Sequence, residues 1–262
     1  MRILVCVKQT PEPGNVHMHA YSGSIDRSDA AVINPFDLYA MEAAACMKDA
    51  DSAVEITALS MGPLTADSVL KDCLALGADK AYLISTEAFA GADIRATACI
   101  LKAAIEKLER EEGMFDAVFC GSKTIDGGTA MLPPYLGELL GSSIATYALD
   151  CKLQEDCLEI LKENDAGNEY YQVSMPCVVS FTKSSKQTRY PLIERIIEAV
   201  QTQIPVLTQE DLFGKEDYPR PVLTVAGFAY RSLKKSSLIV QEADQAEGAK
   251  KLVGMMYDAR VL

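Results

Sequence analysis

The sequence predicts an α/β protein built on a doubly wound, mostly parallel sheet. Over the first 150 residues, short apolar runs rich in β-branched residues alternate with longer segments whose apolar residues recur at helical spacing. This alternation is typical of parallel strands joined by helices that cover both faces of the sheet. A chain of 262 residues with 49% hydrophobic and 24% charged residues is long enough for one large domain with an appendage.

The elements can be placed in order from these patterns. Asn34 followed by Pro35 supplies a capping side chain and a proline at the first helical position, and Asp93 is placed to cap a later helix. Gly77 is placed to end the helix before the third strand. The expected strands are 3–8, 54–61, 80–85, 116–121 and 144–149, and the expected helices are 36–48, 64–76, 93–110 and 129–140.

After residue 150 the pattern changes. Residues 158–165 and 170–182 have the composition of strands, and the DAGN sequence between them predicts a β-hairpin. The stretch RYPLIERIIEAVQTQ at 189–203 predicts a short amphipathic helix. We therefore place the first domain at 1–204, including the hairpin and this helix.

The remaining residues, 205–262, are expected to form an extended arm. The arm begins with a charged stretch that contains glycine and prolines and offers little that could form a core. Its last part, 246–262, is apolar enough to be one helix. Because such an arm has too little local core to hold itself, we expect it to pack on a partner chain.

Composition excludes several classes of function. A net charge of -12 without a basic cluster disfavours nucleic acid and anionic membrane surfaces as partners. No apolar run is long enough to span a bilayer, and the start lacks the pattern of a signal peptide, so a cytoplasmic location is expected. The eight cysteines form no CxxC pair, and His17 and His19 have no metal-site neighbours, so neither a metal nor a catalytic side chain is expected.

The loops that follow the expected strands are the candidate binding site. In open parallel sheets, ligands bind outside the carboxyl ends of the strands. Those ends are rich in small and polar residues, as turns in general require. Four such loops at one edge favour a binding site over coincidence; they are CVKQTPEPG at 6–14, SMGPLTADS at 60–68, STEAFAGAD at 85–93 and CGSKTIDGGTA at 120–130.

Taken together, the motifs resemble one family, the beta subunits of electron-transfer flavoproteins. The carrying motifs are ILVCVK at the start, INPFDLYAMEAA at 33–44, ALSMGP at 58–63, LALGADKAYLIS at 74–85, FDAVFCGSKTIDGGTA at 115–130, and MPCVVSF followed by RYP and the arm. They span nearly the whole chain in the family's order, which makes their joint occurrence specific.

The resemblance implies an adenine-nucleotide alpha hydrolase-like fold in a heterodimer with an alpha subunit. In this family the alpha subunit carries an FAD that exchanges electrons with partner dehydrogenases. The beta subunit holds either a structural AMP or, in electron-bifurcating members, a second FAD that accepts hydride from NADH. Ferredoxin is a further possible redox partner of a bifurcating complex.

The residues expected to bind the cofactor come from the resemblance and from the strand ends. For Lys8 a solvated strand end is the alternative, and Asp126 and Asp93 are alternatively turn or cap residues. Gly127 and Gly128 would let backbone N–H groups approach phosphates beside a helix start near Thr129. The full set is Cys6, Lys8, Asn34, Pro35, Phe36, Asp37, Met61, Gly62, Asp93, Thr97, Gly121, Thr124, Ile125, Asp126, Gly127, Gly128, Thr129, Ala130 and Met131.

The choice between FAD and AMP depends on two stretches. The short IDGGTA loop and AFAGADIRAT at 88–97 are similar to the FAD-binding, bifurcating members, whereas AMP-type members carry a longer acidic loop. Met131 and Gly128 depart from the usual glutamine and acid, and Pro133 and Pro134 follow where glycine and proline are usual. FAD is therefore expected, with AMP as the alternative.

A separate segment is expected to dock the partner dehydrogenase. Tyr190, Pro191, Leu192 and Ile193 fall where the family places its recognition loop, with Ile193 as the apolar anchor. The charges after Ile193 differ from the usual basic pattern, which predicts a partner other than the mitochondrial-type acyl-CoA dehydrogenase. A nucleotide-binding regulatory domain of the universal stress protein kind is the rival function, which the hairpin and the long arm disfavour.

Overall fold

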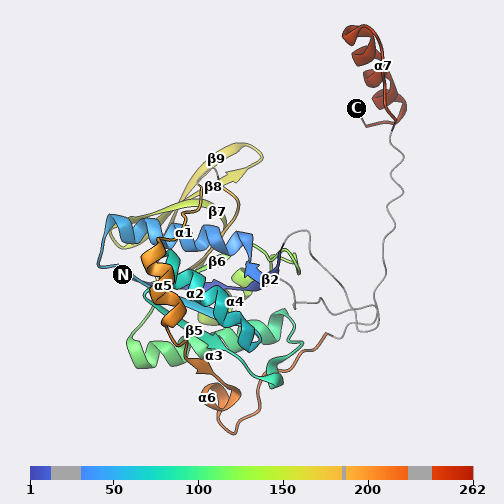
Figure 1. Ribbon diagram of the computed structural model, residues 1–262. Helices are drawn as coiled ribbons and strands as arrows, with labels where there is room; N and C mark the ends of the chain where they lie inside the picture. Colours follow the sequence, from blue (N-terminus) through green and yellow to red (C-terminus); the bar gives the residue numbers. More distant parts are fainter. Residues whose placement is uncertain (13–30, 185–186, 224–237, 262) are drawn as a thin grey trace. The chain divides into compact units, whose positions relative to one another are not determined.

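The computed structural model (Figure 1) describes residues 1–12, 31–184, 187–223 and 238–261. The chain divides into two units, Met1–Val225 and Ala226–Leu262, and each is described by itself. The first unit carries the sheet and nearly all of the helices. The second contains α7 (Gln245–Asp258), whose exposed apolar side chains include Leu252 and Tyr257.

A nine-stranded sheet forms the centre of the first unit, so the α/β fold class is confirmed. Its first seven strands are parallel, and the last two run antiparallel to their neighbours. The order is β11 (Val206–Leu207), β5 (Lys80–Ile84), β4 (Glu55–Met61), β1 (Arg2–Val7), β6 (Ala117–Gly121), β10 (Cys177–Phe181), β7 (Ser143–Gln154), β8 (Cys157–Asn164) and β9 (Gly167–Ser174). A separate antiparallel pair joins β2 (Gln9–Pro11) to β3 (Ala31–Ile33).

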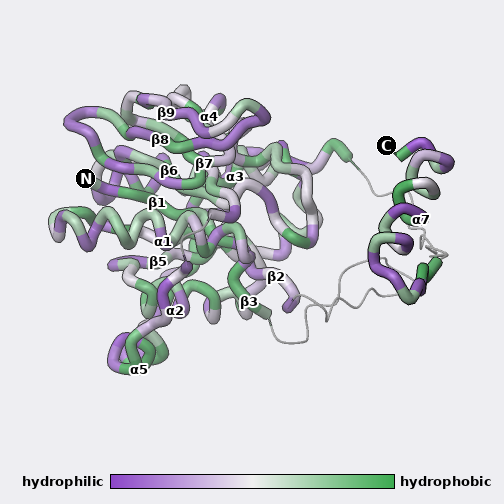
Figure 2. Tube along the Cα trace, turned by 90° about the horizontal axis from the view of Figure 1, so that it is seen from above, coloured by the Kyte–Doolittle hydropathy of each residue, from purple (hydrophilic) through white to green (hydrophobic). Residues whose placement is uncertain are grey.

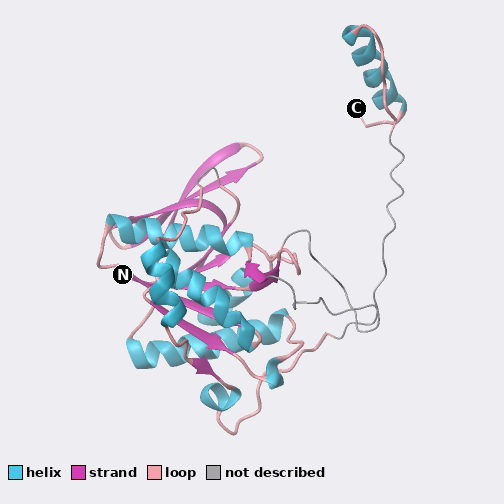
Figure 3. Ribbon diagram, viewed as in Figure 1, coloured by secondary structure: helices cyan, strands magenta, loops and turns pink. Residues whose placement is uncertain are grey.

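Helices cover both faces of this sheet (Figure 3). Residues of β1 alternate between the faces, because successive side chains of a strand point to opposite sides. Ile3 and Val5 belong to the core under α1 and α2, whereas Leu4 packs with residues of α3 and α4. The helices are α1 (Pro35–Ala50), α2 (Asp67–Leu76), α3 (Ile94–Glu112), α4 (Leu132–Leu140), α5 (Ile193–Gln201) and α6 (Gln209–Phe213), with short 3-10 turns η1 (Leu64–Ala66) and η2 (Glu87–Phe89).

The tube view in Figure 2 shows α1 and α2 on one side of the central strands and α4 on the other, with apolar segments concentrated between them. The five expected strands and the expected hairpin are confirmed. The hairpin is β8 and β9, which pair down to Asn164 and Gly167. Gly77 ends α2 with a φ of 126°, a conformation that glycine adopts without steric cost.

Three expected boundaries were wrong. The stretch 170–182 is two strands, because the chain turns at Pro176 and β10 returns to the middle of the sheet between β6 and β7. The helix expected from residue 129 begins at Leu132, since Gly128 and Ala130 adopt positive φ angles of 68° and 56° that a helix cannot contain. The helix expected from residue 189 begins at Ile193, after a proline that disfavours helical backbone before it.

The order of the strands fixes where a ligand would bind. From β1 the chain passes to β4 and β5 on one side and then crosses to β6 on the other side of β1. In an open parallel sheet, this reversal leaves a crevice at the carboxyl ends of the two strands. The loops after β1 and β6 therefore meet at the switch point.

The segment after residue 204 starts on the sheet. β11 extends the sheet beside β5, and the N–H of Ser85 donates to the carbonyl oxygen of Leu207. The division of the chain into a domain at 1–204 and an arm at 205–262 stays a prediction. Packing of the arm on another chain stays a prediction. In the described ranges, no helix is both long enough and apolar enough to cross a membrane.

Candidate functional site

Asp37 joins the three elements that meet at the switch point. Its carboxylate is buried in the first turn of α1. One oxygen accepts a hydrogen bond from the backbone N–H of Lys8 at 2.7 Å, after the end of β1. The other accepts from the Asn34 side-chain amide at 2.9 Å and from the N–H of Gly121, the last residue of β6, at 3.1 Å. Asp37 therefore fixes β1, α1 and β6 relative to one another.

Asn34 extends this connection to the loop that follows β6. Its side-chain amide also donates to the carbonyl oxygen of Lys123 at 2.9 Å, and its amide oxygen accepts from the N–H of Ile125 at 3.2 Å. The expectation that the Asn34 side chain caps α1 was wrong, because all of its hydrogen bonds go elsewhere. The reason is that this fully buried amide satisfies backbone groups of the loop, at Lys123 and Ile125, in place of the helix N–H groups.

The loop 122–131 has a defined conformation. Lys8 extends its ammonium group to both carboxylate oxygens of Asp126 at 2.8 Å, while its side chain stays 38% exposed. Within the loop, the N–H groups of Gly127 and Gly128 donate to the side chain and the carbonyl of Thr124, at 3.2 Å and 2.8 Å. A tight turn thus presents residues 125–131 at the edge of the sheet.

Two buried hydroxyls at this edge have no hydrogen-bond partner among the described residues. They are Ser60, the second-last residue of β4, and Ser122, which directly follows β6. A buried polar group without a partner is costly, so these two hydroxyls are placed where a bound ligand could supply the partner. These hydroxyls and the ordered loop fit a nucleotide placed across the ends of β4, β1 and β6.

Asp93 lies at the start of α3, beyond the end of β5. One oxygen caps the helix by accepting from the N–H of Ala96 at 2.8 Å, which confirms the expected cap. The other accepts from the N–H groups of Val222 and Leu223, at 2.8 and 3.1 Å. Thr97 follows in the same first turn, half-buried. Asp93 therefore also ties the chain after α6 to the body of the first unit.

The strand order brings most of the expected site residues together. Because β4, β1 and β6 are adjacent, Cys6, Lys8, Asn34–Asp37, Met61, Gly62 and Gly121–Met131 share one edge. Asp93 and Thr97 follow β5, two strands away from β1. The two groups could touch one ligand only if it extends across the end of β4.

The electron transfer flavoprotein domain family matches residues 22–212. The chain belongs to this family. It is 40% identical over 210 residues to the electron transfer flavoprotein subunit beta of Megasphaera elsdenii, covering 79% of this chain and 78% of that protein.

Two further relatives have more specific names. Subunit CarD of the caffeyl-CoA reductase-Etf complex of Acetobacterium woodii is 35% identical over 81% of this chain and 80% of its own. Protein FixA of Bradyrhizobium diazoefficiens is 30% identical over 94% of this chain and 88% of its own. The resemblance to electron transfer flavoprotein beta subunits is thereby confirmed.

Three residues of this electron transfer flavoprotein that lie at this edge were not identified from the sequence. Ser60 and Ser122 were not expected to take part, although a hydroxyl at the end of an otherwise apolar strand is the signal that could have found them. Lys123 was also missed. Its ammonium group lies 5.4 Å from the centre of the Phe36 ring, and its carbonyl oxygen binds Asn34. Lys123 therefore packs the loop onto the start of α1.

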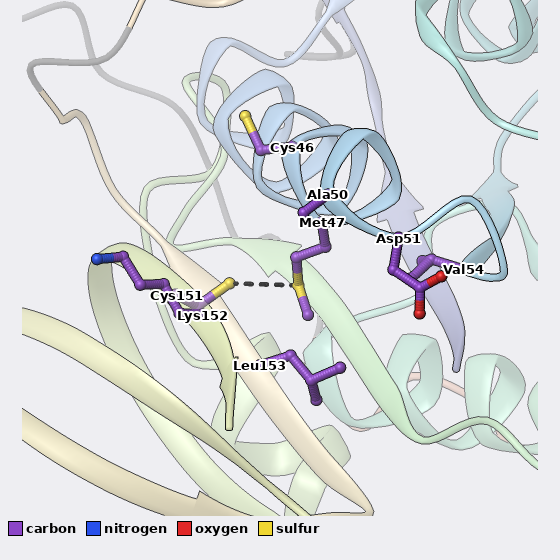
Figure 4. Close-up of a pocket in the computed structure, with 8 residues that line it drawn as sticks. All are labelled: Cys46, Met47, Ala50, Asp51, Val54, Cys151, Lys152 and Leu153. Atoms are coloured by element: carbon purple, nitrogen blue, oxygen red, sulfur yellow. Dashed lines mark hydrogen bonds between the residues drawn. The ribbon is translucent and has the colours of Figure 1, made fainter. Parts of the chain in front are cut away.

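A cavity of about 360 Å³ lies elsewhere in this flavoprotein subunit, between the last turns of α1 and β7 (Figure 4). In Figure 4 the sulfur atoms of Met47 and Cys151 face each other, at 3.8 Å, and Cys46 points away from them. The cavity is at the opposite end of α1 from Asp37 and is mainly apolar. It is therefore separate from the candidate site. Among the described residues, no group of three potential ligands could hold a metal ion.

Stability should depend on pH through Asp37. Burial raises the pKa of this carboxyl from its ordinary 3.8 to about 7, against the lowering effect of the hydrogen bonds from Asn34, Lys8 and Gly121. The folded state then holds a proton that the unfolded state releases, so stability is greatest below the ordinary pKa and falls as pH rises toward 7. We expect ionisation of Asp37 to lower the free energy of unfolding by about 2–3 kcal/mol between pH 5 and pH 8.

Urea unfolding at several pH values measures this effect. Asp37→Asn cannot ionise, so its free energy of unfolding should change less with pH than that of the wild type, whatever its absolute stability. The two slopes are compared over the same pH range. Parallel slopes would show that Asp37 is already ionised at pH 5 in the folded state.

Proposed function

We propose that this chain is the beta subunit of a heterodimeric electron transfer flavoprotein and that it binds FAD at the switch-point edge. In this role it passes electrons between NADH or a dehydrogenase and other redox partners. The observation that carries the proposal is the junction of β1, α1 and β6 through Asp37 and Asn34, from which the loop 122–131 extends. A bound FAD would supply the redox chemistry, and the chain would supply position and electrostatics.

The structure limits which groups could meet the phosphates. The N–H groups of Gly127 and Gly128 are engaged with Thr124, and Pro133 and Pro134 leave the first turn of α4 without two of its usual donors. The backbone N–H groups of residues 129–132 are therefore the ones that would bind the phosphates. Positive φ angles at Gly128 and Ala130 turn this stretch at the edge of the sheet.

FAD is proposed over AMP because the loop is short and because AFAGADIRAT follows β5 at the neighbouring strand end. Asp93 and Thr97 belong to this second stretch, and a molecule reaching them from the loop 122–131 must span β4 and β1. FAD is long enough to cover several strands, whereas AMP is confined to fewer. A structural AMP in a non-bifurcating flavoprotein remains the alternative.

Counting the cofactors tests this proposal. The chain is co-expressed with an alpha subunit, and FAD and AMP are measured per purified heterodimer. Two FAD support the proposal and make flavin-based electron bifurcation testable with NADH and ferredoxin. One FAD and one AMP would establish the alternative. A colourless homodimer that retains ATP would instead show a stress-protein-like regulator.

The partner dehydrogenase is proposed to dock on α5 and the residues before it. Tyr190, Leu192 and Ile193 are largely exposed, and Ile197 and Val200 continue the apolar surface along the helix. α5 rests on α2 through one side, where Ala199 is buried. Exposed apolar side chains gathered on one helix are typical of an interaction site.

Replacing Ile193 by aspartate is expected to abolish electron delivery. Its side chain is 76% exposed, so the change should leave folding intact while placing a charge at the centre of the apolar surface. Transfer can be measured with the acryloyl-CoA reductase of Anaerotignum propionicum, whose electron transfer subunit gamma is 36% identical to this chain. Met114→Asp, also exposed but outside α5, is the matched control. Equal transfer rates in both variants and the wild type would contradict this docking site.

A further inference from the structure

Arg189 connects the segment before α5 to the side of α1. Its Nε and one terminal nitrogen donate to the two carboxylate oxygens of Glu42 at 3.0 and 3.1 Å, and its backbone N–H donates to Glu42 at 2.8 Å. The same terminal nitrogen reaches Asp49 at 2.8 Å. Together these contacts hold both the backbone and the side chain of Arg189.

The contact with Glu42 is sheltered from water. The Glu42 side chain is 12% exposed and that of Arg189 is 29% exposed, whereas Asp49 is mostly open to solvent. Burial alone would raise the pKa of Glu42, but the hydrogen bonds from Arg189 hold that pKa below its usual range. A two-pronged contact of a guanidinium with a sheltered carboxylate is stronger and more directional than an exposed ion pair.

The next residues along the chain form the apolar surface. Tyr190 follows Arg189 directly, and Leu192 and Ile193 come within four residues of it. Residues 187–192 have no regular secondary structure, so a hydrogen-bonded ladder does not fix their path. The path of this stretch therefore depends on how Arg189 is held.

The helix that receives Arg189 also builds the cofactor edge. Asp37 and Glu42 lie five positions apart on α1, which is about 7.5 Å along the helix axis. A helix of sixteen residues packed on the sheet is a rigid element. One rigid helix thus sets the position of the loop 122–131 through Asn34 and of the apolar surface through Arg189.

We infer that Arg189 is a positioning residue that holds residues 190–193 on α1 in the geometry that a redox partner docks against. This inference rests on the proposed function, because the partner is the dehydrogenase proposed above. The site on α1 consists of Glu42 and Asp49, with the Cys46 thiol between them, within 3.2 Å of Glu42.

Hydrogen exchange on the FAD-loaded heterodimer tests the holding role. Arg189→Ala should speed exchange in peptides covering 190–197 and should raise the rate at which a maleimide labels Cys46, relative to the wild type. Arg110→Ala removes an exposed arginine at the end of α3 and is the matched control. Arg189→Lys should give an intermediate exchange rate, since a single ammonium cannot reproduce the two-pronged contact.

Kinetics with the acryloyl-CoA reductase of Anaerotignum propionicum test the docking role. Arg189→Ala should raise KM for the reductase about tenfold and leave kcat and the flavin content unchanged, because loss of a charge-assisted contact costs about a factor of ten. Unchanged exchange in 190–197 would overturn the inference, as would faster exchange with an unchanged KM. If the wild-type heterodimer transfers no electrons to this reductase, the failure counts against the proposed function, and the exchange result alone then decides the role of Arg189.

Discussion

Replacing Gly121 by alanine is expected to destabilise the protein by about 3 kcal/mol or more and to abolish cofactor binding. A Cβ at this position would lie 2.2 Å from an Asp37 carboxylate oxygen and 2.8 Å from both the Asp37 nitrogen and the Phe36 carbonyl carbon. The first neighbour could swing away, but the other two are backbone atoms of α1 and cannot yield without moving the helix. The N–H of Gly121 is also one of the donors to Asp37.

Urea unfolding and FAD content of the purified protein measure this effect. Gly254→Ala is the control, because a Cβ there meets open space within a helix, where alanine is favoured over glycine. Asp37→Ser combined with Gly121→Ala removes the closest contact and should recover only part of the stability. A Gly121→Ala protein with wild-type stability and full FAD content would show that α1 can shift away from β6.

The edge of the sheet was predictable because it depends on local patterns. The strand ends follow from short apolar runs, and loops rich in small residues at those ends predict where a ligand binds. Lys8, Asp37 and Gly121 could be placed at this edge from the sequence. Their mutual hydrogen bonds could not, because they join residues 29 and 84 positions apart.

The errors occurred where distant contacts outweigh local preference. Asn34 followed by proline has the pattern of a helix cap, yet its side chain binds Lys123 and Ile125, about 90 positions later. A helix was expected from residue 129, but positive φ angles in the loop delay it to Leu132. Arg189 gave no signal at all, since its partner Glu42 lies 147 positions away.

Asn34→Ala is expected to lose about 2–4 kcal/mol of stability, because it leaves several buried groups without partners. The amide of Asn34 is fully buried and serves Asp37, the carbonyl oxygen of Lys123 and the N–H of Ile125. Leaving a buried polar group unpaired costs its full desolvation penalty. Loss of these contacts also frees the loop 122–131 from α1, so the FAD proposed for this site should dissociate during gel filtration.

Two comparisons separate the loop contacts of Asn34 from its general contribution. Asn164→Ala removes a half-buried side chain that bonds the N–H of Ala166 in the β8–β9 turn and the Glu169 side chain, and should cost under about 1 kcal/mol. Asn34→Asp keeps an acceptor for the N–H of Ile125 but places a second carboxylate against Asp37. It should therefore lose as much stability as Asn34→Ala, and its loss of stability should be larger at high pH, where both carboxyl groups ionise. If Asn34→Ala instead retains FAD and shows wild-type hydrogen exchange in 122–131, then the remaining contacts of the loop are sufficient to hold it. These include the Lys8–Asp126 ion pair at 2.8 Å and the packing of Lys123 on Phe36.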